Sequence, residues 1–513
     1  MSKKKSLFVI GGILLAMLLA AGTALWYERG VLDSYVLREK IEKVARDRLH
    51  ADVELASFHV SFFPGFEVQV TGFVLRNPQR PDVPPTIEIR KFTAQAGLLA
   101  LFERRPHLHA LHIQGLIVNI PPRQPNKEPR KPFHTNFLID EITADNTTLN
   151  IFHKDGSPPM RFLLHKLRIN SFQPDNPAQF RASLTNPKPV GEIQTQGQFG
   201  PWNPDDPSQT AVAGNYTFSN ADLGTIKGIS GTLSSKGSFD GVLDYIEVQG
   251  KTETPNFEVN VSNHPMPLDT QFNAVVDGMN GNTVLNSIQI QLRDSYLIAR
   301  GDVAKGPRQP GRAVALHVAA RSARAQDLLR VAVKSDKPLL TGMVSMNTQF
   351  VIPSRRTNDT DITNRLDLRG HFNIASAHFT RNSIQKKINA LSRRGLGHPN
   401  DPADSDAASA FTGAFTLKNG IVKFSRLTFK VSGAVVLLNG TYNLDTEALN
   451  FRGTLSLEAK LSQTTTGMKS LLLKLVNPVF EKKNAGAVLP IKITGTREKP
   501  SFGLDLGRVF AKK

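Results

Sequence analysis

Residues 449–461 read LNFRGTLSLEAKL and alternate apolar with polar side chains. Successive side chains of a β-strand point to opposite faces, so this period of two predicts a strand with one apolar face. The apolar side chains of that face are Leu449, Phe451, Leu455, Leu457, Ala459 and Leu461. Burying them is worth roughly 10 kcal/mol, at about 1.5–3 kcal/mol each, so something apolar must cover the strand.

The same alternation recurs from about residue 52 onward. Phe66, Val68 and Val70 alternate with polar residues, and residues 288–293 and 366–374 repeat the pattern. We expect on the order of 25 such strands. Dipeptides that tolerate positive φ in tight hairpins favour antiparallel pairing, and they are Asp155-Gly156, Asp240-Gly241, Asn280-Gly281, Asn419-Gly420 and Asn439-Gly440.

Helical periodicity is scarce after residue 50, with candidates at residues 323–333, 383–394 and 467–480. The third candidate has a broad apolar stripe, which suits either a lid over one end of a groove or an ordinary core helix. So few helices cannot cover about 25 apolar strand faces. The cover is therefore a second sheet, as in a sandwich, or an apolar ligand bound in a groove, and periodicity leaves both open.

An uncharged run at residues 7–27 predicts a membrane anchor. At about 1.5 Å of rise per residue it forms a helix of about 31 Å, the depth of a bilayer's hydrocarbon core. Three lysines at residues 3–5 predict a cytosolic N-terminus, a single pass through the inner membrane and the bulk of the chain in the periplasm. The anchor residues are Leu7, Ile10, Leu14, Leu18, Trp26 and Tyr27. A cleavable signal peptide is the alternative, but its apolar run is usually only about 7–15 residues.

The predicted fold is mainly β, with an N-terminal transmembrane helix followed by an elongated antiparallel β-groove or a sandwich-like region with a few short helices. The predicted segments are a cytosolic tail (1–5), a transmembrane anchor (6–27), an amphipathic helix (28–50), an N-terminal β region (51–200), a central β region (201–362) and a C-terminal β domain (363–513). If the cover is lipid, the candidate lipid-facing residues are Phe66, Val68, Val70, Leu449, Phe451, Leu455, Leu457 and Leu461.

The formal charge is +19 at pH 7 over 513 residues, and the chain has no cysteine. An exported, anchored protein rarely meets nucleic acid, so the expected partners are membrane lipids, either phospholipid or lipopolysaccharide, with anionic headgroups. The alternative is that the positive charge is spread over the surface and only improves solubility. The absence of cysteine excludes disulfides and thiolate metal sites.

Catalytic motifs are missing from the sequence. It contains no GxSxG, no HExxH and no GxGxxG that opens a helix. Gly250-Lys251-Thr252 resembles the end of a phosphate-binding loop, but Tyr245 stands where such a loop needs its first glycine. We therefore expect a protein without enzymatic activity and without a cofactor.

The one histidine cluster consists of His107, His109 and His112. Strict alternation on a strand places His107 and His109 on one face and His112 on the other. Because no cysteine or paired carboxylate lies nearby in the sequence, we expect no metal site here.

Short motifs at both ends of the chain share an arrangement with a known family. They are VSFFPG at residues 60–65, LHIQGL at 111–116, FTLKNG at 415–420, LNGTY at 438–442, LPIKITGT at 489–496 and KPSF at 499–502. Together with the anchor and the basic helix after it, this arrangement resembles the AsmA family. The resemblance implies an inner-membrane-anchored periplasmic protein of Gram-negative-type cells that is linked to outer-membrane biogenesis. Larger members of the family resemble bridge-like lipid transfer proteins with an apolar β-groove, and the family has no shared catalytic residues.

We therefore expect a non-enzymatic envelope protein that handles lipid through an apolar β-groove and supports outer-membrane biogenesis or phospholipid transport. The alternative is a structural or assembly factor for outer-membrane components. Such a factor would act through contacts with envelope assembly proteins, without lipid transfer.

Overall fold

The structure, a computed structural model, describes residues 52–61, 65–76, 84–97, 107–120, 138–152, 159–173, 175–201, 207–306, 311–334, 337–354, 361–400, 409–459 and 486–505. The predicted anchor (6–27), the amphipathic helix (28–50), the helix at 467–480 and Leu461 lie outside these ranges. Within the ranges, no helix is both long enough and apolar enough to cross a membrane.

The chain divides into two units. Unit 1 contains the described residues up to Asp222 together with residues 234–250 and 275–281. Its strands are β1 (Asp52–Glu54), β2 (Ser57–Ser61), β3 (Phe66–Arg76), β4 (Ile87–Ala96), β5 (His107–Ile120), β6 (Leu138–Ile151), β7 (Met160–Phe172), β8 (Ala178–Pro187), β9 (Val190–Phe199), β10 (Ala211–Asp222), most of β12 (Thr232–Val242) and the start of β13 (Tyr245–Val259). A short 3-10 helix, η2 (Pro207–Gln209), precedes β10.

Unit 2 contains residues 223–233, 251–274 and the described residues from Asn282 onward. Its strands are β11 (Ile229–Ser230), the rest of β13, most of β14 (Met266–Val276), β15 (Thr283–Leu292), β16 (Ser295–Ala304), β17 (Ala313–Arg324), β18 (Leu340–Ile352), β19 (Asp367–Phe379), β20 (Ser409–Lys418), β21 (Ile421–Val431), β22 (Ala434–Asn443), β23 (Leu449–Leu457), β24 (Ala487–Gly495) and β25 (Pro500–Leu504). Its helices are η3 (Leu223–Thr225), α3 (Ala325–Ala332), α4 (Ile362–Arg365) and α5 (Asn382–Gly395).

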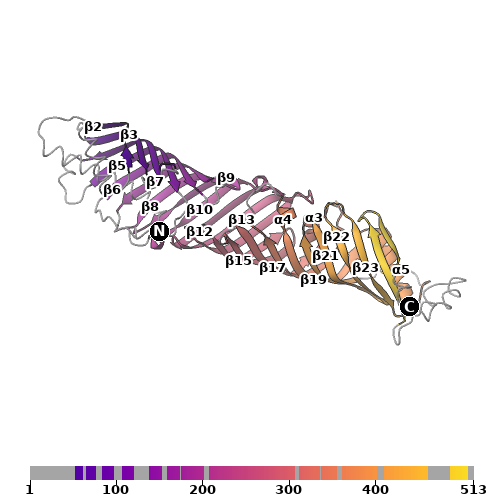
Figure 1. The fold of residues 1–513 in the computed structure, drawn as a ribbon. Helices are drawn as coiled ribbons and strands as arrows, with labels where there is room; N and C mark the ends of the chain where they lie inside the picture. Colours follow the sequence, from indigo (N-terminus) through magenta and orange to yellow (C-terminus); the bar gives the residue numbers. More distant parts are fainter. Residues whose placement is uncertain are drawn as a thin grey trace, which may run out of the picture. The chain divides into compact units, whose positions relative to one another are not determined.

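The described strands belong to one open sheet of 25 strands. Most neighbours along the chain pair antiparallel, and successive strands lie side by side in chain order (Figure 1). The prediction of a mainly β fold is confirmed. A sandwich of two packed sheets, one of the two architectures left open by the sequence, is not what the described strands form.

Alternation of burial follows the alternation of the sequence. In β3, buried Phe66, Val68 and Val70 alternate with half-buried Glu67 and Gln69. The predicted strand at 449–461 is β23, which ends earlier than expected, at Leu457. Each strand thus contributes to one apolar and one polar face, because its side chains point alternately to the two sides.

The turn predictions are partly right. Asn419 and Gly420, at φ 50° and 71°, form the two-residue hairpin between β20 and β21. Asn280-Gly281 lies in the loop after β14, where the Gly281 N–H donates to Asp277 O. Asp155-Gly156 lies outside the described residues.

Two of the predicted turns are wrong, because Asp240-Gly241 and Asn439-Gly440 lie inside β12 and β22. At Gly440 a close approach of the neighbouring strand requires glycine. A Cβ there would lie 2.2 Å from the Asn450 carbonyl oxygen of β23. Glycine favours a turn because it lacks a side chain, and for the same reason it permits two strands to approach closely.

The helix predictions within the described residues are confirmed, since residues 323–333 and 383–394 correspond to α3 and α5. Residues 250–252 lie within β13, a strand, whereas a phosphate-binding loop would lead into a helix.

Strands β5 and β6 pair parallel, unlike the antiparallel pairing predicted for neighbouring strands.

The prediction that His112 lies on the opposite face to His107 and His109 is wrong. Between β4 and β5 the register shifts by one residue, so that Leu108 and Leu111, three residues apart, are both buried at 4% and 2% exposure. Such a bulge reverses the alternation beyond it. His112 therefore joins the polar face, where its Nδ1 lies 2.6 Å from Thr143 Oγ1.

Candidate functional site

One face of the sheet carries the buried apolar side chains of the strands, and we call it the apolar face. Residues directly opposite one another on paired strands share a face, as Val70, Phe92 and Ile113 do across β3, β4 and β5. The opposite side, which carries side chains such as Gln69, Thr93 and His112, is the polar face. The apolar face is the candidate functional surface.

In unit 1, the apolar face is a packed core near the first strands. The predicted residues Phe66, Val68 and Val70 lie together there and are 1%, 2% and 1% exposed. Phe92 packs edge-on against Phe73, with the ring centroids 6.2 Å apart. Side chains covered to this extent have little surface left for a ligand.

In unit 2, β23 places the other predicted residues on the apolar face. Leu455 lies between Val436 of β22 and Leu489 of β24. Phe451 and Leu457 are 7% and 6% exposed, whereas Leu455 keeps an intermediate exposure. Leu449, at the other end of β23, is also only partly buried. This half of the predicted set therefore includes positions that a ligand could contact.

Two separate groups of contacting phenylalanine rings lie on the apolar face of unit 2, and the sequence analysis predicted only one of these rings, Phe451. Neighbouring ring centroids lie 4.8–6.4 Å apart. The rings belong to Phe372, Phe379, Phe411, Phe415, Phe424, Phe429 and Phe451. Alternation alone would have found Phe411 and Phe415, which lie four residues apart on β20. The two rings on β19 and the two on β21 lie seven and five residues apart, because the register shifts within each of these strands, so alternation could not have found both members of either pair.

Helices α3 and α5 lie at the same end of the strands. Each follows an odd-numbered strand, β17 or β19, and both of these strands are antiparallel to β18. Leu328 of α3 and Ile388 and Leu391 of α5 pack on buried clusters of the apolar face. Helices α3 and α5 therefore cover one end of this face in unit 2 and not its full length.

The side of α5 that is most buried is polar. Gln385, Asn389 and Ser392 are 6%, 9% and 7% exposed. Gln385 Oε1 accepts from the Phe379 backbone N–H at 2.9 Å, and Ser392 Oγ donates to the Ser432 carbonyl oxygen at 2.9 Å. These bonds fix α5 to the ends of β19 and β21, because buried polar groups are costly unless they are paired.

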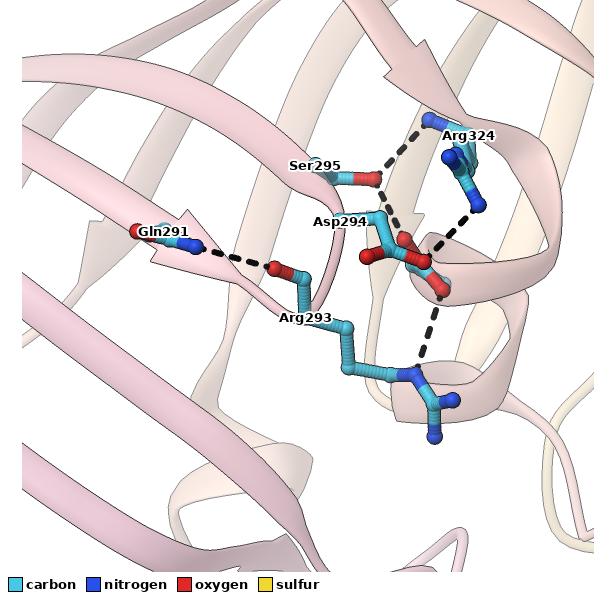
Figure 2. A network of polar contacts seen from close by, with 6 residues as sticks. Gln291, Arg293, Asp294, Ser295 and Arg324 are labelled. Carbon is cyan, nitrogen blue, oxygen red and sulfur yellow. Dashed lines mark hydrogen bonds and ion pairs between the residues drawn. The ribbon is translucent and has the colours of Figure 1, made fainter.

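Figure 2 shows the polar network that fixes α3 to the turn between β15 and β16. Ser295 Oγ donates to Asp327 Oδ2 at 2.8 Å and accepts from the Arg324 backbone N–H at 2.9 Å. Arg293 Nε lies 3.5 Å from Asp327 Oδ1, and Arg324 donates to Asp294 at 2.8 Å. Asp327 is only 4% exposed. Removing a partner from a buried charge is strongly destabilising, so this network holds α3 in one position.

Hydroxyl groups interrupt the apolar face in each unit. In unit 1, the Tyr216 and Ser235 hydroxyls lie 3.2 Å apart, and burial raises the pKa of Tyr216. In unit 2, the Thr252 and Thr270 hydroxyls lie 2.7 Å apart. Within each pair one hydroxyl donates to the other, which lowers the cost of placing these polar groups on the apolar face.

A hollow of about 520 Å³ on unit 1 is lined mainly by polar-face side chains. Its lining residues are Arg168, Asn170, Gln179, Phe180, Arg181, Gln196, Gly197, Gly214 and Asn215. Arg168 and Arg181 lie directly opposite each other on β7 and β8, and Arg168 pairs with Glu141. This lining suits water and polar groups better than an acyl chain.

No protein-family model, curated protein or solved structure was found to match the chain. What the site can do chemically follows from the apolar face itself. A continuous row of apolar side chains offers dispersion contacts and removes hydrocarbon from water, without requiring directional bonds.

Proposed function

We propose that this protein is a non-enzymatic, membrane-anchored envelope protein that handles lipid through the apolar face of its sheet. In this role it supports outer-membrane biogenesis or phospholipid transport. Residues 6–27 would anchor it in the inner membrane, with the N-terminus in the cytosol and the sheet in the periplasm.

The observation that carries the proposal is a single sheet with one apolar face. In the described residues of unit 2, no second sheet covers that face, and α3 and α5 cover only one end of it. An apolar face on which positions such as Leu449 and Leu455 stay partly exposed is compatible with a binding surface. The resemblance of both chain ends to the AsmA family supports lipid as the ligand.

The dimensions of unit 2 suit acyl chains. From β15 to β25 the chain order gives ten steps between strands. At about 4.8 Å per step, the strands extend over about 48 Å. An acyl chain fills one leaflet of a bilayer, about 15 Å of hydrocarbon, so several chains could lie along the face.

Lipid contact is expected where the apolar face keeps exposed area. Leu449 and Leu455 are partly buried, whereas Phe66, Val68 and Val70 are nearly fully covered. We therefore centre the proposal on β23 and its neighbours in unit 2.

A second candidate is an assembly factor that contacts envelope proteins without moving lipid. The packed core around Phe66 favours this alternative for unit 1, because a face that is already filled by its own side chains needs no ligand.

The experiment that tests the proposal is site-specific photo-crosslinking in the intact membrane-anchored protein. A photoreactive residue at Leu455 should give phospholipid or lipopolysaccharide adducts, and one at Thr454, on the opposite face of the same strand, should not. Mass spectrometry of the protein in mild detergent should show co-purified lipid. If the photoreactive residue at position 455 forms adducts only with neighbouring strands or with other proteins, the lipid proposal is wrong and the assembly factor is favoured.

A further inference from the structure

Three metal-ligating side chains meet on the polar face at the start of the β5–β6 pair. His107 Nε2 lies 2.9 Å from Asp140 Oδ2, and His109 Nδ1 lies 3.3 Å from the same oxygen. The two imidazole rings are 4.9 Å apart in an edge-on arrangement. One donor atom from each residue lies within 4.8 Å of the other two.

The fold creates this cluster from distant parts of the sequence. His107 and His109 are two residues apart on β5 and point to the same side, while Asp140 comes from β6, 31 residues after His109. The parallel register sets Leu108 opposite Ile139, which brings Asp140 beside the histidines. No paired carboxylate could be recognised near these histidines in the sequence, because local spacing does not reveal this crossover.

The donor atoms are close to the arrangement that a tetrahedral ion requires. Zinc binds imidazole nitrogen and carboxylate oxygen at about 2.0–2.2 Å, which places neighbouring tetrahedral donors roughly 3.3–3.5 Å apart. The two distances to Asp140 Oδ2, 2.9 Å and 3.3 Å, are near this spacing, and the two histidine nitrogens lie within 4.8 Å of each other, so rotation of the side chains would complete the arrangement. Near His109 there is room for such movement, because Gly97 has no side chain and even an added Cβ would lie 3.5 Å from His109 Nε2.

Asp140 is suited to the role of an anionic ligand. Its Oδ2 faces the ring nitrogens of both histidines, and a carboxylate oxygen is an established zinc ligand. The side chains of His107, His109 and Asp140 are 31%, 56% and 49% exposed, so an ion can reach them from solvent.

We propose that His107, His109 and Asp140 bind a divalent transition-metal ion, best matched by zinc, with water in the remaining coordination position. Imidazole nitrogen suits zinc, nickel and copper, whereas magnesium and calcium prefer ligand sets made of oxygen. The proposal goes beyond lipid handling and does not depend on it.

The expected effect of the ion is to fasten the parallel pair. Two other side-chain contacts already cross it, His112 with Thr143 at 2.6 Å and Asn150 with Asn119 at 2.9 Å. At the start of the pair, a metal would replace the hydrogen bonds of His107 and His109 to Asp140 with coordinate bonds. Because it binds only the folded arrangement, the stability of unit 1 should rise with the logarithm of the zinc concentration once that concentration exceeds the dissociation constant.

The test uses the full-length, tag-free protein in mild detergent and zinc chloride as the only ligand. Calorimetric titration should give one zinc ion per chain, and the thermal midpoint should rise with zinc. His107→Ala, His109→Ala and Asp140→Ala should each weaken zinc binding by about tenfold or more, since each removes a ligand. His112→Ala, on the same face of the same strand, is the matched control and should bind as the original chain does.

Cobalt chloride supplies a readout that does not depend on stability. The visible absorption of tetrahedral cobalt should appear in the original chain and in His112→Ala, and disappear in Asp140→Ala. The proposal is overturned by a stoichiometry well below one, by equal affinity in the ligand variants, or by the absence of the tetrahedral spectrum. The proposal is also overturned if His112→Ala loses as much zinc affinity as the three ligand variants.

Discussion

Replacing Leu455 by aspartate tests directly whether the apolar face binds lipid. Leu455 lies between Val436 and Leu489 on neighbouring strands and keeps part of its surface exposed. With lipid bound, the new carboxylate would lie against hydrocarbon. A penalty of about 3 kcal/mol for that buried charge would weaken lipid binding roughly 100-fold.

The same substitution should affect folding less than binding. The ladder between β23 and its neighbours β22 and β24 depends on backbone hydrogen bonds, which the substitution leaves in place. A partly exposed side chain can also turn its charge toward water when lipid is absent. We therefore expect Leu455→Asp to destabilise unit 2 by only about 1–2 kcal/mol.

The matched control is Thr454→Asp, which adds the same charge one residue earlier on the polar face. Thr454 lies opposite Leu437, whose surface is 46% exposed. Native mass spectrometry of co-purified lipid and the thermal midpoint are measured for both variants. The reasoning is refuted if folded Leu455→Asp retains as much lipid as the original chain, or if both variants lose lipid equally. Failure of Leu455→Asp alone to fold would indicate a closed core at this position.

Further substitutions test separate parts of the structure. Gly453→Val should lower the thermal midpoint of unit 2 by the equivalent of about 2 kcal/mol or more, because even a Cβ at Gly453 would lie 1.8 Å from Leu437 O. Asp327→Ala should speed hydrogen exchange in α3, since it leaves the buried Ser295 hydroxyl without its acceptor at a cost of about 1–3 kcal/mol; unchanged exchange would contradict the role of the network. Phe66→Ala should destabilise unit 1 by about 3–5 kcal/mol without changing lipid adducts at position 455. A reporter enzyme fused after Lys513 should show that the C-terminus lies outside the cytosol. A reporter that folds and works in the cytosol would show the opposite orientation.

The strands and the described helices could be predicted because their signals are local. Alternation at Phe66, Val68 and Val70 identifies β3 without any knowledge of its neighbours, and the 3.6-residue period does the same for α5. Even there, the apolar stripe did not reveal which side of α5 is most covered. Gln385 and Asn389 are more buried than Ile388. Gln385 accepts from the Phe379 backbone N–H at the end of β19 and donates to Asn389 Oδ1 on the same helix.

What the sequence could not predict depends on contacts between strands. The bulge that moves His112 to the polar face arises from the register of β4 against β5, and the crossover that brings Asp140 to His107 arises from a parallel pairing. Asn439-Gly440 has the chemistry of a turn, and only the approach of β23 shows why glycine stands inside a strand. Each of these features requires knowledge of a partner strand that local spacing does not contain.

The glycines of unit 2 also explain what kind of surface the apolar face offers. A Cβ at Gly413 would lie 2.7 Å from the ring of Phe372, and one at Gly440 would lie 2.8 Å from the ring of Phe451. Each ring therefore packs over the glycine of the neighbouring strand and fills the space that a side chain would occupy there. It does not border an open pocket. Rings packed in this way make a continuous surface with few directional contacts, and discrimination between ligands requires directional contacts or close-fitting pockets. Under the proposed function, the face should accept acyl chains without selecting a headgroup, and the mixture of lipids crosslinked at position 455 should reflect the membrane's own composition.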